Sequence, residues 1–241
     1  MDKPKIVSIH QPDFFPWMGF FNKIFMSDVF VIFDTGQIPN KKSSYTNRVK
    51  LVLNGESRWG NTIPITKGKK VNISIKDVEI VEGMFHKKKF LKTLHFYYKK
   101  APFYKNVIDF IEHLILFDNN NLCEYNLNSI YHILDKVGIN KNKIVLASEL
   151  AFKFEENKDL NIRISEIVKK VNGDIYLSGN GSVDYMNEQI FKENKIKLKY
   201  QNFIHPNYPQ FNTIEFQSGV SIIDAFMNIG FKGVHDLINI S

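Results

Sequence analysis

The first 34 residues alternate between apolar runs and a helical pattern, with very short connections. Residues 5–9 form a short apolar run, and large apolar side chains then recur at helical spacing from Trp17 to Phe25. A second apolar run, at 28–33, ends at Asp34. This pattern predicts the strand–helix–strand start of a parallel sheet, so we expect an α/β fold with a Rossmann-like parallel sheet flanked by helices. Ligands of such sheets bind outside the carboxyl ends of the strands.

The middle of the chain follows a different pattern. Residues 48–81 contain alternating apolar positions with a phase shift near Lys76 and Asp77, which predicts an antiparallel meander with a bulge there. Residues 86–137 carry three amphipathic helix patterns and are expected to form a helical insertion. Strand and helix patterns then alternate again, with strands expected at 143–147, 174–178 and 196–201. We find no internal repeat or linker-like segment, which favours a single domain over residues 1–241.

Composition narrows the class of protein. The chain has 241 residues, of which 44% are hydrophobic, enough for one substantial core. It contains no apolar run long enough to span a membrane, and its N-terminal apolar run is too short for a signal peptide, so we expect a cytoplasmic protein without membrane insertion. The net charge of +7 comes mostly from lysines spread along the chain. That distribution favours a general solubility effect over nucleic-acid binding.

The segment from His10 to Trp17 places an imidazole, an amide and a carboxylate on a loop before a helix. The start of a helix has free backbone N–H groups and favours anions. We therefore take His10 as a candidate catalytic base and Gln11, Asp13 and Trp17 as candidate binding residues. The alternative is that Asp13 caps the helix and His10 satisfies buried backbone groups.

Four polar residues follow the second strand: Asp34, Gln37, Asn47 and Arg48. They are candidates for binding sugar hydroxyls or, through the flat guanidinium of Arg48, a phosphate. The alternative is a simple turn after Asp34, with Arg48 on a solvated face.

A glycine-containing loop, SGNGS, directly follows the strand expected at 174–178. Its glycines could let the backbone approach a phosphate or carboxylate. Candidate binding residues here are Ser178, Gly179, Asp184 and Tyr185. An ordinary strand-to-helix turn explains the same pattern.

A second His-Pro segment begins at His205, which is the second candidate base, and it brings Tyr208 and Gln210 as candidate binding residues. Its prolines would stiffen a binding wall, although a loop with a purely structural role explains the pattern equally well. The segment from Ser221 to Asp224 predicts a helix cap, with Gly230 at the helix end. The histidines show no zinc-binding spacing, so no metal site is expected.

Several of these segments together resemble the WbqC-like family: HQPDFFPWMGFFNKI, SDVFVIFD, the Asn47-Arg48 pair, YLSGNGSVDYM, HPNYPQ and SIIDAFMNIG. The family occurs in gene clusters for O-antigen and other surface polysaccharides, so the resemblance implies a sugar-containing substrate. The sequence departs from the family pattern at MFHKKK, where a tryptophan is expected before His86. The opening is also similar to nucleotidyltransferase and pantothenate-synthetase-like enzymes, but it lacks their H-x-G-H turn.

These observations lead to one functional hypothesis and one alternative. The hypothesis is a transferase or ligase that attaches an acyl or aminoacyl group to a nucleotide-linked amino sugar, with His10 or His205 as the base. It implies an activated acyl donor or a nucleotide as co-substrate and an acyl carrier as a candidate partner. The alternative is a non-catalytic protein that binds a sugar nucleotide or scaffolds a polysaccharide-synthesis complex. In either case we expect the candidate residues to line one cleft.

Overall fold

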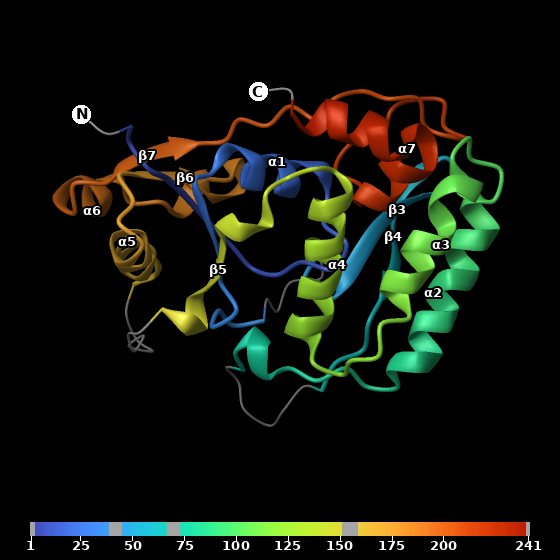
Figure 1. The fold of residues 1–241 in the computed structure, drawn as a ribbon, viewed down its shortest axis with the longest axis horizontal. Helices are drawn as coiled ribbons and strands as arrows, with labels where there is room; N and C mark the ends of the chain where they lie inside the picture. Colours follow the sequence, from blue (N-terminus) through green and yellow to red (C-terminus); the bar gives the residue numbers. More distant parts are fainter. Residues whose placement is uncertain (1–2, 39–44, 67–72, 151–158, 240–241) are drawn as a thin grey trace.

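A parallel sheet forms the centre of the computed structural model, which describes residues 3–38, 45–66, 73–150 and 159–239. Its strands lie in the order β5-β2-β1-β6-β7, and every pairing is parallel (Figure 1). The strands are β1 (Ile6–His10), β2 (Val29–Ile32), β5 (Ile144–Leu146), β6 (Ile175–Ser178) and β7 (Lys197–Tyr200). The expected Rossmann-like sheet is therefore confirmed.

The strand order reverses direction between β1 and β6. From β1 the chain moves outward through β2 to β5, then returns to β6 on the other side of β1 and moves outward to β7. The loops after β1 and β6 consequently diverge, which is where open α/β sheets bind their ligands.

Helices cover both faces of the sheet. On one face α1 (Met18–Met26) packs against α7 (Ile222–Ile238), and on the other face α5 (Leu160–Lys170) packs against α6 (Glu188–Glu193). Strand β2 shows the division, because Phe30 and Ile32 belong to the first core and Val31 to the second. Side chains of alternate strand residues thus pack into the cores on opposite faces of the sheet.

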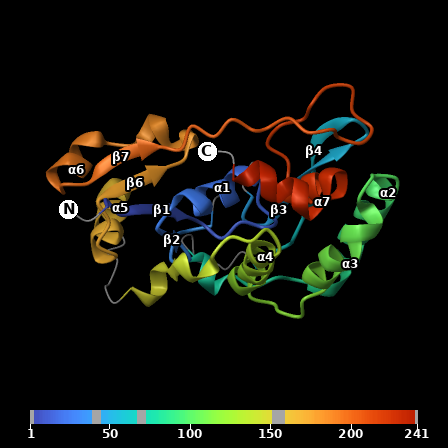
Figure 2. The same cartoon turned by 45° about the horizontal axis from the view of Figure 1, so that its top comes forward.

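The expected helical insertion is present as α2 (Gly83–Tyr98), α3 (Tyr104–Ile115) and α4 (Leu122–Lys136). Helices α2 and α3 lie at the opposite end of the molecule from α5 and α6 (Figures 1 and 2). Their buried residues join those of α1 and α7 in one continuous core, so the insertion is packed onto the sheet domain.

In the described part of 48–81, the expected antiparallel meander is a hairpin of β3 (Arg48–Leu53) and β4 (Glu56–Thr62), with a register shift between Val49 and Lys50. The expected strand with a bulge near Lys76 and Asp77 is wrong, because Ile75–Asp77 is a 3₁₀ turn. Ile75 and Val78 are both buried, and a 3₁₀ turn places residues three apart on the same side. The part of the meander at 67–72 lies outside the described residues.

The described residues also form the short 3₁₀ turns η2 (Lys141–Lys143), η3 (Ala147–Glu149) and η4 (Asn180–Tyr185). The segment between β6 and β7 is divided into η4 and α6, and Asn187 caps α6 by accepting a hydrogen bond from the Gln189 N–H. Ser221 caps α7 as expected, its Oγ accepting from the Ile223 N–H at 3.3 Å. Gly230, at φ 69°, kinks α7 instead of ending it.

After β7 the chain crosses the molecule to the β3–β4 hairpin before it enters α7 (Figure 2). The Ser57 N–H donates to Gln217 Oε1 at 3.0 Å, and the Ser221 N–H donates to the Lys50 carbonyl at 2.8 Å. The hairpin is therefore fixed to the rest of the fold by residues from the last quarter of the sequence. Among the described residues, no helix combines the length and apolarity needed to cross a membrane.

Candidate functional site

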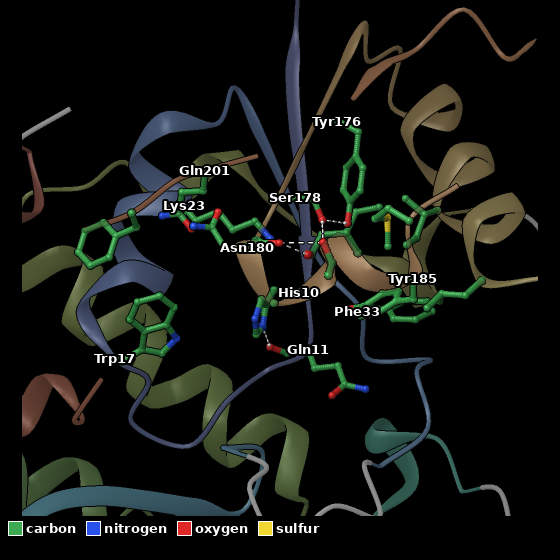
Figure 3. Close-up of a pocket in the computed structure, with 18 residues that line it drawn as sticks. His10, Gln11, Trp17, Lys23, Phe33, Tyr176, Ser178, Asn180, Tyr185 and Gln201 are labelled. Atoms are coloured by element: carbon green, nitrogen blue, oxygen red, sulfur yellow. Dashed lines mark hydrogen bonds between the residues drawn. The ribbon is translucent and has the colours of Figure 1, made fainter. Parts of the chain in front are cut away.

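A cavity of about 490 Å³ lies at the carboxyl ends of β1 and β6, where the strand order reverses (Figure 3). Its volume is within the range of small-molecule sites. Its polar lining residues are His10, Gln11, Lys23, Ser178, Asn180, Ser182 and Gln201. Its aromatic lining residues are Trp17, Phe33, Tyr176, Tyr185 and Phe203.

His10, the last residue of β1, has a defined protonation state. Its Nδ1 lies 3.0 Å from the Gln11 carbonyl oxygen. Because a carbonyl only accepts, Nδ1 carries the proton and Nε2 the lone pair. Burial and the positive charge of Lys23 lower the pKa of His10 to about 4, although the Gln11 hydrogen bond acts in the opposite direction. The imidazole is thus neutral at pH 7, and its side chain remains 34% exposed.

Two buried ionisable residues accompany His10: Asp13 is 5% and Lys23 is 3% exposed. Asp13 Oδ2 lies 3.7 Å from His10 Nδ1, and Thr46 Oγ1 donates to Asp13 Oδ1 at 3.4 Å. Burial raises the pKa of Asp13 to about 7 and lowers that of Lys23 to about 8, while the attraction between the two opposes both shifts. Helix α1 begins after Trp17, so Asp13 does not cap it.

Lys23 and Gln201 line the cavity, although neither was predicted from the sequence pattern. Lys23 stands in an apolar helix pattern, and its Nζ donates to the Ile9 carbonyl at 3.2 Å. Gln201 donates to the Gly19 carbonyl and to Asn22 Oδ1, each at 2.8 Å. For Lys23, the signal available in the sequence was the polar pair Asn22-Lys23 within an otherwise apolar helix.

The glycine loop after β6 is closed by its own hydrogen bonds. Ser178 Oγ and Ser182 Oγ share a hydrogen bond of 2.6 Å, and Ser182 Oγ donates to the Gly179 carbonyl at 2.7 Å. Gly179 has an extended backbone with φ −78°, and a Cβ added at Gly179 or Gly181 would meet no atom within 4 Å. Close packing therefore does not require glycine at either position, and both glycines line open space in the cavity.

Trp17 forms an aromatic wall of the cavity together with Phe203, at a ring-centroid distance of 5.5 Å. The indole folds back over the first turn of α1. A Cβ at Gly19 would lie 2.2 Å from the Trp17 ring, so glycine is needed there to admit the indole.

The cavity brings together six of the residues predicted from sequence: His10, Gln11, Trp17, Ser178, Gly179 and Tyr185. Asp13 lies next to His10, and Gln37 adjoins the rim, because its carbonyl accepts from Gln11 Nε2 at 2.9 Å.

Two predicted acidic residues are not among the cavity-lining residues. Asp34 is buried and accepts from the N–H and hydroxyl of Ser148, so it holds the start of η3. Asp184 lies in η4 and is exposed.

The predicted residues of the hairpin region make contacts there instead of lining the cavity. Asn47 Nδ2 donates to the Ile63 carbonyl at 2.9 Å. Arg48 Nε donates to Thr62 Oγ1 at 3.0 Å, and its guanidinium lies over the Trp59 ring at 5.9 Å.

His205 stands behind the cavity wall, with its ring stacked on Trp17 at 6.4 Å. Burial lowers its pKa, its Nδ1 lies 3.4 Å from the Pro206 carbonyl, and its Nε2 is buried with no hydrogen-bond partner among the described residues. It is not among the residues that line the cavity.

Tyr208 and Gln210 belong to a separate buried network around Asp224. The Tyr208 hydroxyl and Gln210 Nε2 donate to Asp224 Oδ1 at 2.8 and 2.9 Å, and the Tyr98 hydroxyl donates to Oδ2 at 2.8 Å. The network ties the segment after β7 to α2 and α7. The cleft expected from the sequence thus contains the residues that follow β1 and β6, while those of the hairpin and of this network lie outside it. The described part of the chain contains no group of three or more His, Cys, Asp or Glu placed to hold a metal ion.

Comparisons with known proteins support the family resemblance that the sequence motifs indicate. A Mycobacterium tuberculosis (strain ATCC 25618 / H37Rv) protein, named Uncharacterized protein Rv1507c, is 24% identical over 229 residues, which cover 94% of this chain and 94% of that protein. No solved structure matches the chain. The sequence matches the WbqC-like protein family over residues 11–236, nearly its whole length. The chain therefore belongs to the WbqC-like protein family.

Proposed function

We propose that this protein is a cytoplasmic transferase or ligase that attaches an acyl or aminoacyl group to the amine of a nucleotide-linked amino sugar, in the synthesis of surface polysaccharide. One observation carries the proposal. His10 stands about one-third exposed in a ligand-sized cavity with Nδ1–H bonded to the Gln11 carbonyl, and Nε2, to which no described residue is hydrogen-bonded, can accept a proton.

The cavity lining supports a sugar nucleotide as the substrate class. Trp17 and Phe203 supply flat apolar surfaces suited to a sugar ring or a base, and Gln11, Asn180 and Gln201 supply amide groups suited to hydroxyls. A pocket of mixed aromatic and polar lining at the strand-order reversal is the usual location for such ligands.

The proposed step is nucleophilic acyl transfer. The amine nitrogen attacks the carbonyl carbon of the activated donor, and an N–C bond forms. The bond between that carbon and the leaving group, a thiolate or a phosphate, breaks, and the leaving group keeps the electron pair. His10 Nε2 takes the proton released by the amine, while the Gln11 carbonyl stabilises the imidazolium through Nδ1–H. A positioned base contributes about 10² to 10⁴ in rate. The lowered pKa of His10 keeps Nε2 unprotonated in the free protein but makes it a weaker base than an ordinary histidine, so we expect the lower end of that range.

The proposal is tested by mass spectrometry of product mixtures. Purified protein is incubated with a panel of amino-sugar nucleotides and with acyl thioesters, acyl phosphates or aminoacyl donors. The proposal predicts that one pair gains the mass of the acyl group minus one hydrogen, and that N-acetylated control substrates, which lack a free amine, gain nothing. Equal gain by the N-acetylated controls would contradict transfer to the amine.

A further inference from the structure

Lys23 is a buried cation with too few partners. Its ammonium has three donors, and the hydrogen bonds of the described residues give it one acceptor, the Ile9 carbonyl. Lys143 provides the contrast, because its Nζ donates to the carbonyls of Ile24, Phe25 and Ser27 at 3.1, 3.0 and 2.7 Å. A buried ammonium is costly unless it is paired and hydrogen-bonded. An anionic ligand would supply what Lys23 lacks.

The same cavity contains a stretch of backbone that a ligand can approach closely. Gly179 and Gly181 line it, and a side chain at either position would enter empty space. Between them, Asn180 Oδ1 accepts from the Asn202 N–H at 2.9 Å, which orients the amide and leaves Nδ2 as a donor. A phosphate suits this lining best, because its several oxygens accept from a cation, an amide and backbone N–H groups together.

We propose that a phosphate group of the ligand is bound in this cavity by Lys23 together with the loop from Gly179 to Gly181. This inference rests on the proposed function, in which the phosphate is that of the nucleotide-linked sugar, and it places the amine of that substrate toward His10. Lys23 is mostly protonated at pH 7, because burial lowers its pKa only to about 8 while nearby Asp13 acts in the opposite direction.

The test measures binding of inorganic pyrophosphate to the full chain by calorimetry at neutral pH. Lys23→Met keeps the length and apolar stem of the side chain and removes the charge, and we expect it to weaken binding at least tenfold. Lys199→Met, which removes an exposed lysine from β7, is the control for net charge and should bind as the wild type does.

A second variant covers the case in which Lys23→Met does not fold. Gly179→Val places a side chain in the empty space on a backbone that any residue adopts, so we expect an unchanged melting temperature and at least a tenfold loss of pyrophosphate affinity. Wild-type affinity in either folded variant, or no pyrophosphate binding by the wild type, would overturn the phosphate site.

The acyl-transfer assay separates this inference from the proposed function. A wild type that acylates an amino-sugar nucleotide without binding pyrophosphate would overturn the phosphate site alone. A wild type that binds pyrophosphate through Lys23 but acylates no amine would support the site and contradict the acyl-transfer reaction.

Discussion

The His10 ring donates its Nδ1 proton to the carbonyl oxygen of the next residue, Gln11, at 3.0 Å. The contact is local, and it is formed where β1 ends and the chain turns away from the sheet. It fixes the tautomer of a histidine at the edge where the sheet binds ligands. The proposed chemistry depends on this contact more than on any other.

Asp13→Asn should change how stability depends on pH. Folding raises the pKa of Asp13 from 3.8 to about 7, so the folded state binds this proton more tightly than the unfolded state does. The stability that it contributes is fully present below the unfolded pKa and is lost as pH rises through about 7. As pH rises through this range, the free energy of unfolding of Asp13→Asn should therefore increase relative to that of the wild type. The expected gain is up to about 4 kcal/mol, because one pKa unit corresponds to about 1.4 kcal/mol.

Urea unfolding between about pH 4 and about pH 7 measures this difference. His10 acts in the opposite direction in both proteins, because its lowered pKa makes stability rise with pH from about 4 to its unfolded value of 6.5. Comparing variant with wild type cancels that contribution if the two groups titrate independently. The exposed Asp184→Asn variant controls for the loss of one negative charge, and a pH-independent difference for Asp13→Asn would contradict the raised pKa.

Gly19→Ala should displace Trp17. The new Cβ would lie 2.2 Å from the indole, which cannot stay in place. Overpacking of this kind costs about 1 to 3 kcal/mol, and the aromatic wall of the cavity would move with the ring. We expect lower stability in urea and weaker binding of the sugar nucleotide by calorimetry. Gly179→Ala is the matched control for stability and should change it by less than about 0.5 kcal/mol.

Tyr208 and Tyr185 should respond in opposite ways to loss of the hydroxyl. Tyr208→Phe leaves one buried hydrogen bond of Asp224 unmade, which costs about 1 to 3 kcal/mol of stability, and KM should not change. Tyr185 is 54% exposed and lines the cavity, so Tyr185→Phe should change KM and leave stability nearly unaltered. The reverse result would place Tyr208 in the site and Tyr185 outside it.

The sequence predicted the part of the site that depends on sheet topology. His10 ends one strand and Ser178 ends another, with Gln11 and Gly179 directly after them, and parallel strands bring such ends to one edge. The apolar pattern of each strand, together with the rule that parallel sheets bind ligands at the carboxyl ends of their strands, was sufficient to predict these residues.

The positions of the other candidate residues depend on tertiary packing, which the periodicity of the sequence does not reveal. Helix α1 lies between the sheet and α7 and is buried from Met18 to Ile24, so its apolar pattern concealed Lys23. Tyr208 and Gln210 were predicted as ligand contacts, but their partner Asp224 had been assigned only to a helix cap. The position of Arg48 follows from how the hairpin packs against residues from the end of the chain.

The most direct test of the proposed role of His10 is the kcat of His10→Gln, measured with the acyl donor and amino-sugar nucleotide that the wild type uses. Glutamine keeps a polar side chain of similar size but provides no base. We predict that kcat falls by about 10² to 10⁴, while the dissociation constant of the sugar nucleotide changes by less than about threefold. An unchanged kcat in the folded variant would remove His10 from the chemistry. Tight binding by the wild type with no mass change under any donor would instead identify a non-catalytic binding protein.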